Sequence, residues 1–256
     1  KMKKNYIEYD NSHWSKIKNP EQALEKYLNN YKHVYNKINI EKIIKVIPKN
    51  KKLHILDYGG GIGYLSAKLF ELGHKVTLAD QSSEAISTAA YFFKKENYKI
   101  NILKAEKGYF STEERYDIVI AKDLIEHVIE DKKMFDNLFG LLNKSGKLII
   151  TTQNTSSLNY LMEGTYKKIK TPKVKWLGWD RTHLRFYNPR SLKLLTKNLP
   201  VNKIEFRGSY IFPYKLIDIL LYKLFRIKKT KFYIIDILLM KIKIIGRYGW
   251  NIMMIC

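Results

Sequence analysis

Hydrophobic positions follow two different spacings along the chain, and the change falls near residue 50. Beyond that point short apolar runs alternate with longer amphipathic stretches. The runs predict strands at residues 53–56, 76–79, 100–103, 116–121 and 147–152, and the stretches predict helices at 64–72, 82–95 and 132–142. Repeated strand–helix units of this length predict a parallel sheet with right-handed crossovers.

Two helices are predicted ahead of this sheet. Asn19 and Pro20 are typical of a helix start, and apolar positions follow at helical spacing from Leu24 to Val34. A second amphipathic stretch, residues 40–47, ends at Pro48. We therefore expect a helical cap over residues 1–50 and the main domain over residues 51–256.

The regular alternation stops after Thr152. A long polar and aromatic segment, about residues 153–188, precedes a predicted helix at 191–199 and a strand near 204–206. Residues 214–247 are apolar yet rich in lysine and predict a helical insertion, and residues 250–255 predict a last strand.

Composition fits a folded α/β domain with decorations. The 256 residues are 45% hydrophobic, and the one cysteine, Cys256, excludes an intramolecular disulfide or a cysteine-rich metal site. No secretion signal follows the first residues and no run is apolar for the ~18 residues of a spanning helix. We therefore expect a cytoplasmic location.

The formal net charge of +23 is spread along the chain. Such a charge attracts nucleic acid, anionic lipid, phosphorylated metabolites or acidic glycans without distinguishing among them. It is therefore a weak indication of the partner.

A glycine-rich turn is the clearest chemical signal. The segment from Asp57 to Gly63 follows a strand and precedes a helix, and Asp80 ends the next strand, where a carboxylate can accept ribose hydroxyls. Asp57 would repel a pyrophosphate but attract the ammonium and sulfonium of S-adenosylmethionine. The charge therefore favours that cofactor over a dinucleotide, and a turn without a ligand is the alternative.

In the order of its motifs the chain resembles the class I S-adenosylmethionine-dependent methyltransferases, and more closely the small-molecule branch with the ubiquinone-biosynthesis O-methyltransferases. The resemblance covers about residues 53–200 and rests on segments 56–63, 78–80, 116–119, 124–128 and 146–152. It implies a doubly wound α/β fold, Rossmann-like, with a seven-stranded, mostly parallel sheet whose last strand is antiparallel.

The resemblance also implies a set of cofactor contacts. Gly59 and Gly61 would lie against the cofactor, with Asp57 near its amino end and Asp80 on its ribose. Lys122 would face it through the backbone, and the adenine would be bordered by Gln81, Ala105 and Glu106.

Three polar residues after the fourth predicted strand would lie near the reacting methyl group. Asp123, Glu126 and His127 share one face if their segment is helical. They could be local structural residues, or a general base at His127 oriented by an acid. They could also be ligands of a divalent metal. The related enzymes usually carry Glu where this chain has Asp123.

A segment rich in aromatic and basic residues, 176–187, would cover the substrate in relatives. His183 and Arg185 are its candidate site residues, and a packed connector is the alternative. Residues 10–14 are a second candidate cover for the cofactor.

The basic apolar tail, residues 214–247, has two interpretations. It could be a structural insertion that covers the sheet or forms a homodimer, or a surface helix that lies on anionic lipid at the inner membrane face.

These observations predict an enzyme that methylates a hydroxyl of a small molecule or glycan precursor, with an anionic, phosphorylated acceptor suited to the charge. An N-methyltransferase and a non-catalytic cofactor-binding protein are the alternatives. RNA methylation is disfavoured, because no nucleic-acid-binding module and no Asn-Pro-Pro-Tyr type string is present.

Overall fold

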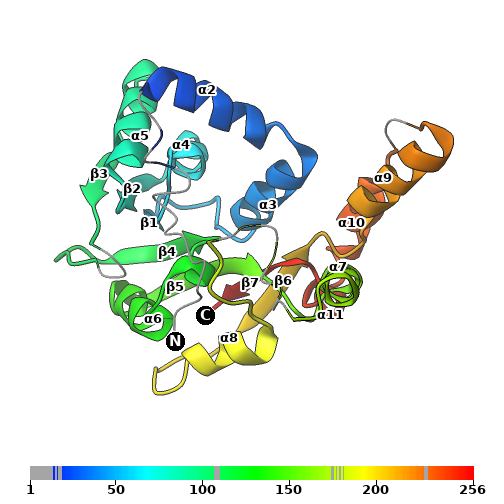
Figure 1. Ribbon diagram of the computed structural model, residues 1–256. Coiled ribbons are helices and arrows are strands. Elements are labelled where there is room, and N and C mark those ends of the chain that lie inside the picture. The colour runs from blue at the N-terminus through cyan, green and yellow to red at the C-terminus, as the bar shows by residue number, and fades with distance from the viewer. Residues whose placement is uncertain are drawn as a thin grey trace.

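The computed structural model describes residues 14, 16, 19–106, 110–173, 176, 178, 180, 182–227 and 230–256 (Figure 1). Within them a seven-stranded sheet has the order β3-β2-β1-β4-β5-β7-β6. The strands are β1 (His54–Tyr58), β2 (Lys75–Asp80), β3 (Asn101–Lys104), β4 (Tyr116–Lys122), β5 (Leu142–Gln153), β6 (Glu205–Ser209) and β7 (Asn251–Ile255). The first five pair in parallel, and β7 lies antiparallel between β5 and β6. The predicted doubly wound, mostly parallel sheet is confirmed.

The strand order reverses beside β1, which pairs with β2 on one side and β4 on the other. Ligands of open α/β sheets bind outside the carboxyl ends of the strands at such a reversal. The ends of β1, β2 and β4 are therefore where a ligand is expected.

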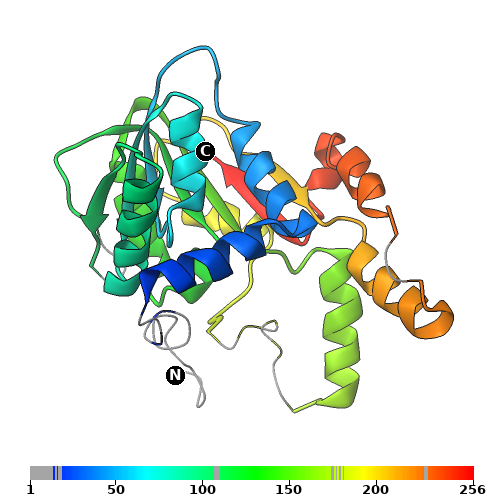
Figure 2. The ribbon, with the colours of Figure 1, turned by 90° about the horizontal axis from the view of Figure 1, so that it is seen from above.

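Helices cover both faces of the sheet (Figures 1 and 2). One layer holds α2 (Pro20–Tyr31), α3 (Val34–Ile44), α4 (Tyr64–Glu71) and α5 (Ser83–Lys95), and the other holds α6 (Asp131–Gly140) and α8 (Pro189–Leu195). Neighbouring strand residues enter opposite cores: Ile55 packs in the first and Leu56 in the second. This double burial explains why the strands are continuous apolar runs.

The segment predicted to be a polar loop after β5 contains a helix, α7 (Leu158–Lys170). The Ser157 side chain caps it by accepting the Tyr160 N–H at 3.0 Å. Its apolar residues follow helical spacing but are largely exposed, among them Leu161, Met162 and Ile169. The sequence prediction of a loop was wrong here, because the segment is polar overall and its helical spacing was not recognised.

The basic tail between β6 and β7 forms α9 (Tyr214–Phe225), α10 (Tyr233–Leu239) and α11 (Lys243–Gly246). With α7 they lie beside the β6–β7 edge of the sheet (Figure 1). Among the described residues, no helix combines the length and apolar character needed to cross a bilayer.

Candidate active site

A cavity of about 460 Å³ lies at the carboxyl ends of β1, β2 and β4. Its lining includes seven of the eight residues predicted to contact a cofactor, namely Asp57, Gly59, Gly61, Asp80, Gln81, Ala105 and Lys122. The eighth, Glu106, follows β3 with an exposed side chain and is not part of the lining. The structure thus brings together residues that are up to 65 positions apart in the chain.

Backbone geometry explains the glycines of the loop after β1. Gly59 has φ +72° and Gly61 has φ +58°, in the left-handed region that disfavours a side chain. A Cβ at Gly59 would lie 2.7 Å from a Leu124 methyl carbon, and one at Gly61 would lie 3.3 Å from the Trp14 ring. Glycine at both positions therefore allows the backbone of the loop to take this conformation beside the cavity.

Two carboxylates stand side by side at this end of the cavity, because β1 and β2 are paired neighbours. Asp57 is buried and accepts a hydrogen bond from the Ser66 hydroxyl at 2.7 Å. Burial, with Asp80 adding to it, raises the pKa of Asp57 to about 6, against the opposing effects of Ser66 and Lys122. Asp80 accepts the backbone N–H groups of Gly61 and Ser82, each at 2.9 Å.

An aromatic wall closes the cavity from the N-terminal side. Trp14, Tyr27 and Tyr31 line it, and the rings of Trp14 and Tyr27 lie 5.0 Å apart. Of the cover predicted at residues 10–14, only Trp14 is within the described residues. Tyr27 and Tyr31 were missed, because their spacing on α2 is that of an ordinary apolar helix face.

These residues fit S-adenosylmethionine. The cavity volume is in the range of small-molecule sites, about 300–1,000 Å³. Asp57 and Asp80 supply negative charge for the cationic methionine part and acceptors for the ribose. The glycine loop lets the backbone approach, and the aromatic wall offers apolar surface.

Asp123 lines the cavity and belongs to a part-buried hydrogen-bond network rather than to a helical face shared with Glu126 and His127. Its backbone has φ +50°, and the helix that follows, Ile125–His127, is a single 3-10 turn. Its Oδ1 accepts from the Thr151 hydroxyl at 2.8 Å and the Asn251 amide at 2.7 Å. Its Oδ2 pairs with Lys122 at 2.8 Å. The expectation of one shared helical face is therefore corrected.

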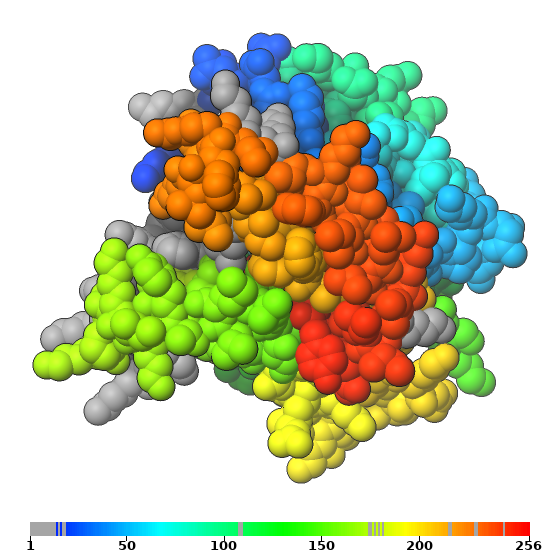
Figure 3. All heavy atoms as spheres, turned by 90° about the vertical axis from the view of Figure 1, so that its right-hand side faces the viewer, coloured from blue at the N-terminus to red at the C-terminus, as the bar shows by residue number. Residues whose placement is uncertain are grey.

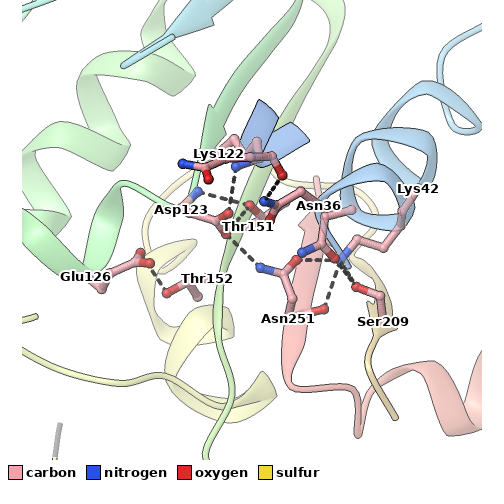
Figure 4. Close-up of polar contacts among 11 residues, drawn as sticks. Asn36, Lys42, Lys122, Asp123, Glu126, Thr151, Thr152, Ser209 and Asn251 are labelled. Atoms are coloured by element: carbon pink, nitrogen blue, oxygen red, sulfur yellow. Dashed lines mark hydrogen bonds and ion pairs between the residues drawn. The ribbon is translucent and has the colours of Figure 1, made fainter. Parts of the chain in front are cut away.

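Lys42 on α3 extends this network (Figure 4). Its ammonium donates to the Asn251 side-chain oxygen at 2.6 Å, the Asn251 carbonyl at 2.8 Å and the Ser209 hydroxyl at 3.0 Å. Three acceptors match the three donors of an ammonium. Burial lowers the pKa of Lys42 to about 7, with Asp123 acting in the opposite direction. Nothing in the local sequence around Lys42 indicated this role.

The charge of Asp123 is maintained by the same contacts. Burial alone would raise its pKa, but the charge and hydrogen bond of Lys122, with the Thr151 and Asn251 bonds, hold the pKa well below the usual range. Asp123 is therefore an anion whose oxygens are engaged, and a poor candidate for a proton acceptor.

Glu126 is fully buried behind the cavity. One of its oxygens, Oε2, accepts the Thr152 hydroxyl at 2.8 Å, while Oε1 is buried with no hydrogen-bond partner among the described residues (Figure 4). Burial, followed by the nearby Asp123, raises the pKa of Glu126 to about 7, and His183 opposes this. A carboxyl group in this setting can hold a proton near neutral pH.

His127 lines the cavity and is oriented by a short relay. Its Nδ1 lies 2.9 Å from the Thr182 hydroxyl, which in turn lies 2.6 Å from Asp180 Oδ1. Burial opposes ionisation of Asp180, but the hydrogen bonds from Thr182 lower the pKa of this carboxyl. Ionised Asp180 can only accept, so Thr182 donates to it and accepts from His127 Nδ1. This assignment makes Nε2 the basic nitrogen of the neutral imidazole.

Segment 176–187 contains two predicted site residues, of which His183 lies beside His127 and Arg185 is engaged by other groups. His183 is buried, with its ring 4.9 Å from that of His127. Arg185 pairs with Asp131 at 2.7 Å and donates to the Ile129 carbonyl at 3.0 Å. Leu177, Trp179 and Arg181 lie outside the described residues.

Among the described residues, the group with metal-ligand spacing is Glu126, His127 and His183, whose ligand atoms all lie within 4.8 Å of one another. It differs from the predicted trio by having His183 in place of Asp123, whose oxygens are taken by Lys122, Thr151 and Asn251.

Comparison with known proteins decides the family. Residues 31–199 match the family described as methyltransferase domain. The chain belongs to the methyltransferases. A ubiquinone biosynthesis O-methyltransferase of Rickettsia felis is 33% identical over 191 residues, which cover 72% of this chain and 76% of that protein. The predicted class, S-adenosylmethionine-dependent methyltransferase, is confirmed.

Other similarities are less extensive. A ubiquinone biosynthesis O-methyltransferase of Rickettsia prowazekii is 36% identical over 133 residues, and the match spans half of this chain and 53% of that protein. A solved structure of a Pyrococcus horikoshii protein aligns with a TM-score of 0.50 at 21% identity, over 66% of this chain and 84% of that one. The structural similarity supports the methyltransferase fold.

Proposed function

We propose that this enzyme transfers the methyl group of S-adenosylmethionine to a hydroxyl of a small molecule, with His127 as the general base. The observation that carries this proposal is the relay from Asp180 through Thr182 to His127, at the edge of a cavity that also contains Asp57 and Asp80. The names of the two Rickettsia relatives, both O-methyltransferases, point to the same atom type in the acceptor.

The cofactor would be held by the residues at the ends of β1 and β2. Asp57 would attract its ammonium, Asp80 would accept its ribose hydroxyls, and the backbone at Gly59 and Gly61 would lie against it. Gln81 and Ala105 would border the adenine, and Lys122 would contact it through the backbone. When bound, S-adenosylmethionine supplies an electrophilic methyl group on a positively charged sulfur.

The acceptor hydroxyl would be handled by the other end of the cavity. His127 Nε2 would take the hydroxyl proton as the oxygen becomes a nucleophile, and the developing imidazolium would be stabilised through Thr182 by the carboxylate of Asp180. A base positioned in this way contributes about 10²–10⁴-fold to a rate. An amine acceptor needs such a base less, which favours oxygen over nitrogen.

A divalent cation on Glu126, His127 and His183 is a second candidate for activating the acceptor, supported by their ligand spacing. Because a carboxyl must lose its proton to bind a metal, a cation here would displace the proton that burial favours on Glu126. Turnover in excess chelator decides between the two. Unchanged turnover supports the histidine base, and loss of turnover restored by one added metal supports the cation.

The charge of the acceptor is a separate question. Arg185, a candidate site residue from the sequence, is paired with Asp131, and Lys122 in the cavity lining is paired with Asp123. We propose residues 51–256 as the catalytic domain, with residues 1–50 as a cap that contributes the aromatic wall.

Calorimetry with S-adenosylmethionine and a radiolabelled transfer assay test the function together. We expect one cofactor molecule to bind per chain. When a panel of phenols, alcohols and amines is offered, we expect the radiolabel in a methyl ether that is stable to base. Absence of cofactor binding would refute the cofactor assignment. Binding without transfer to any acceptor favours a non-catalytic member of the family, and label on amines alone favours N-methylation.

A further inference from the structure

Helices α7, α9, α10 and α11 lie on one face of the molecule (Figure 3), and each carries exposed apolar side chains. We call the part contributed by α9 and α10 the tail surface, and define it by Ile219, Leu220, Leu224, Phe225, Ile234 and Leu238, all exposed. Leu224 and Phe225 expose 63% and 66% of their surface. The tail surface lies beyond residues 31–199 and so outside the region matched by the methyltransferase family.

The tail surface is anchored to the sheet, so its exposure is a property of the fold. The buried carboxylate of Asp236 on α10 accepts the backbone N–H groups of Tyr210, Ile211 and Phe212 at 2.8, 2.5 and 3.1 Å. These three residues directly follow β6. The amide of Asn159 on α7 also donates to the Tyr210 carbonyl, at 2.8 Å. The helices are therefore held with their apolar residues outward.

Basic residues accompany this apolar surface. Residues 214–248 contain nine Lys and Arg against two Asp and no Glu. Asp236 is buried in its anchoring role, and Asp218 accepts the hydroxyl of Thr230. Lys223, Arg226 and Lys241 are exposed. The surface thus combines apolar and cationic side chains with little negative charge to balance them.

An exposed apolar face can bind a second copy of this chain or a lipid bilayer, and the charge of the tail surface distinguishes between the two. A second copy of this chain would bring the same cationic residues and a net charge of +23 to the contact. Lysine is depleted in protein interfaces, and like charges oppose association. An anionic bilayer neutralises these residues while its acyl boundary accepts the apolar ones.

We propose that the tail surface binds an anionic lipid bilayer, with the apolar residues of α9 and α10 inserted at the boundary of headgroups and acyl chains. Lys223, Arg226 and Lys241 contact the lipid phosphates. The contact is peripheral, since α9 has 12 residues and α10 has 7. It is independent of the proposed function, because lipid binding is measured without turnover.

Sedimentation with vesicles of stated composition is the test. The chain is mixed with vesicles of phosphatidylcholine alone or with one third phosphatidylglycerol, at low and high salt. We expect pelleting with the anionic vesicles at low salt. Lys223→Glu with Arg226→Glu should weaken it by about tenfold or more, since each substitution replaces a cation that the anionic surface attracts with an anion that it repels.

An apolar variant tests insertion separately from charge. Leu224→Ser with Phe225→Ser keeps every charge, and we expect about tenfold weaker binding because less apolar area is buried at the interface. Leu194→Ser on α8 is its control, with the same 63% exposure on a different element. Lys94→Glu with Lys95→Glu on α5 is the control for charge. Both controls should bind as the parent chain does.

Three results would overturn the proposal. The parent chain could fail to pellet, the α5 charge variant could lose as much binding as the α9 variant, or the apolar variant could bind like the parent. Loss of dimerisation in the apolar variant, without vesicle binding by the parent, would identify a second copy as the occupant. Slower hydrogen exchange in α9 and α10, but not α8, on vesicles is the expected result in the unmutated chain.

Discussion

Asp57 and Asp80 reach the cavity from two adjacent strands, whereas Asp123, which also lines the cavity, is held by Lys122, Thr151 and Asn251, and through Asn251 by Lys42. The first pair needs only the parallel pairing of β1 with β2. The second group needs α3, β4, β5 and β7 to be assembled together. The pair of carboxylates on β1 and β2 is thus locally encoded, and the group around Asp123 depends on the completed sheet.

The largest effect should come from the acceptor end. His127→Ala should lower turnover by about 10²–10⁴-fold, because it removes the proposed base, while cofactor affinity stays unchanged. Steady-state kinetics and calorimetry measure the two quantities. His33→Ala, an exposed histidine, is the control. Equal turnover in the His127→Ala and His33→Ala variants would contradict the role of His127 as the base.

The cofactor end should respond in the opposite way. Asp80→Ala should weaken S-adenosylmethionine binding by about 10–100-fold, because charged hydrogen bonds contribute about 1.5–3 kcal/mol each. Calorimetry measures the affinity, and circular dichroism checks the fold. Asp136→Ala on α6 is the matched surface control. A loss in turnover with no loss in affinity would contradict the ribose role of Asp80.

Acidification should weaken cofactor binding through Asp57. Its carboxyl is charged above a pKa of about 6, so affinity should fall by about tenfold between pH 7 and pH 5 as it takes up a proton. The folded chain takes up this proton more readily than the unfolded chain, so this group does not destabilise the fold on acidification. Asp57→Asn should have lower affinity at pH 7 and a flat profile. An unchanged slope in that variant would assign the effect to another group.

The last effect concerns the stability of the fold rather than turnover or binding. Because the pKa of Lys42 is lowered to about 7 in the fold, the unfolded chain binds more protons between pH 7 and 10. The contribution of Lys42 to the free energy of unfolding should therefore rise with pH across that window and be lost as pH falls through 7. Urea unfolding of the parent and of Lys42→Met measures it. Parallel profiles would show that Lys42 titrates normally.

The order of strands and helices was predictable because it rests on spacing that is visible in short stretches. The strand predicted at residues 76–79 is β2 (Lys75–Asp80), and the helix predicted at 82–95 is α5 (Ser83–Lys95). α7 escaped prediction although its apolar residues follow helical spacing, because the segment around them is polar overall. The position of β7, inserted between β5 and β6, follows from strand pairing that spacing does not reveal.

The sequence by itself determined the glycine loop, the acid at the end of each of the first two strands and hence the character of the cofactor, because neighbouring parallel strands end at the same edge of a sheet. Only the tertiary structure decided which groups complete the cavity. The partners of Asp123, the Thr182–Asp180 support of His127 and the aromatic wall join residues far apart in the chain. Their contacts depend on strand register and helix docking, which no local pattern encodes.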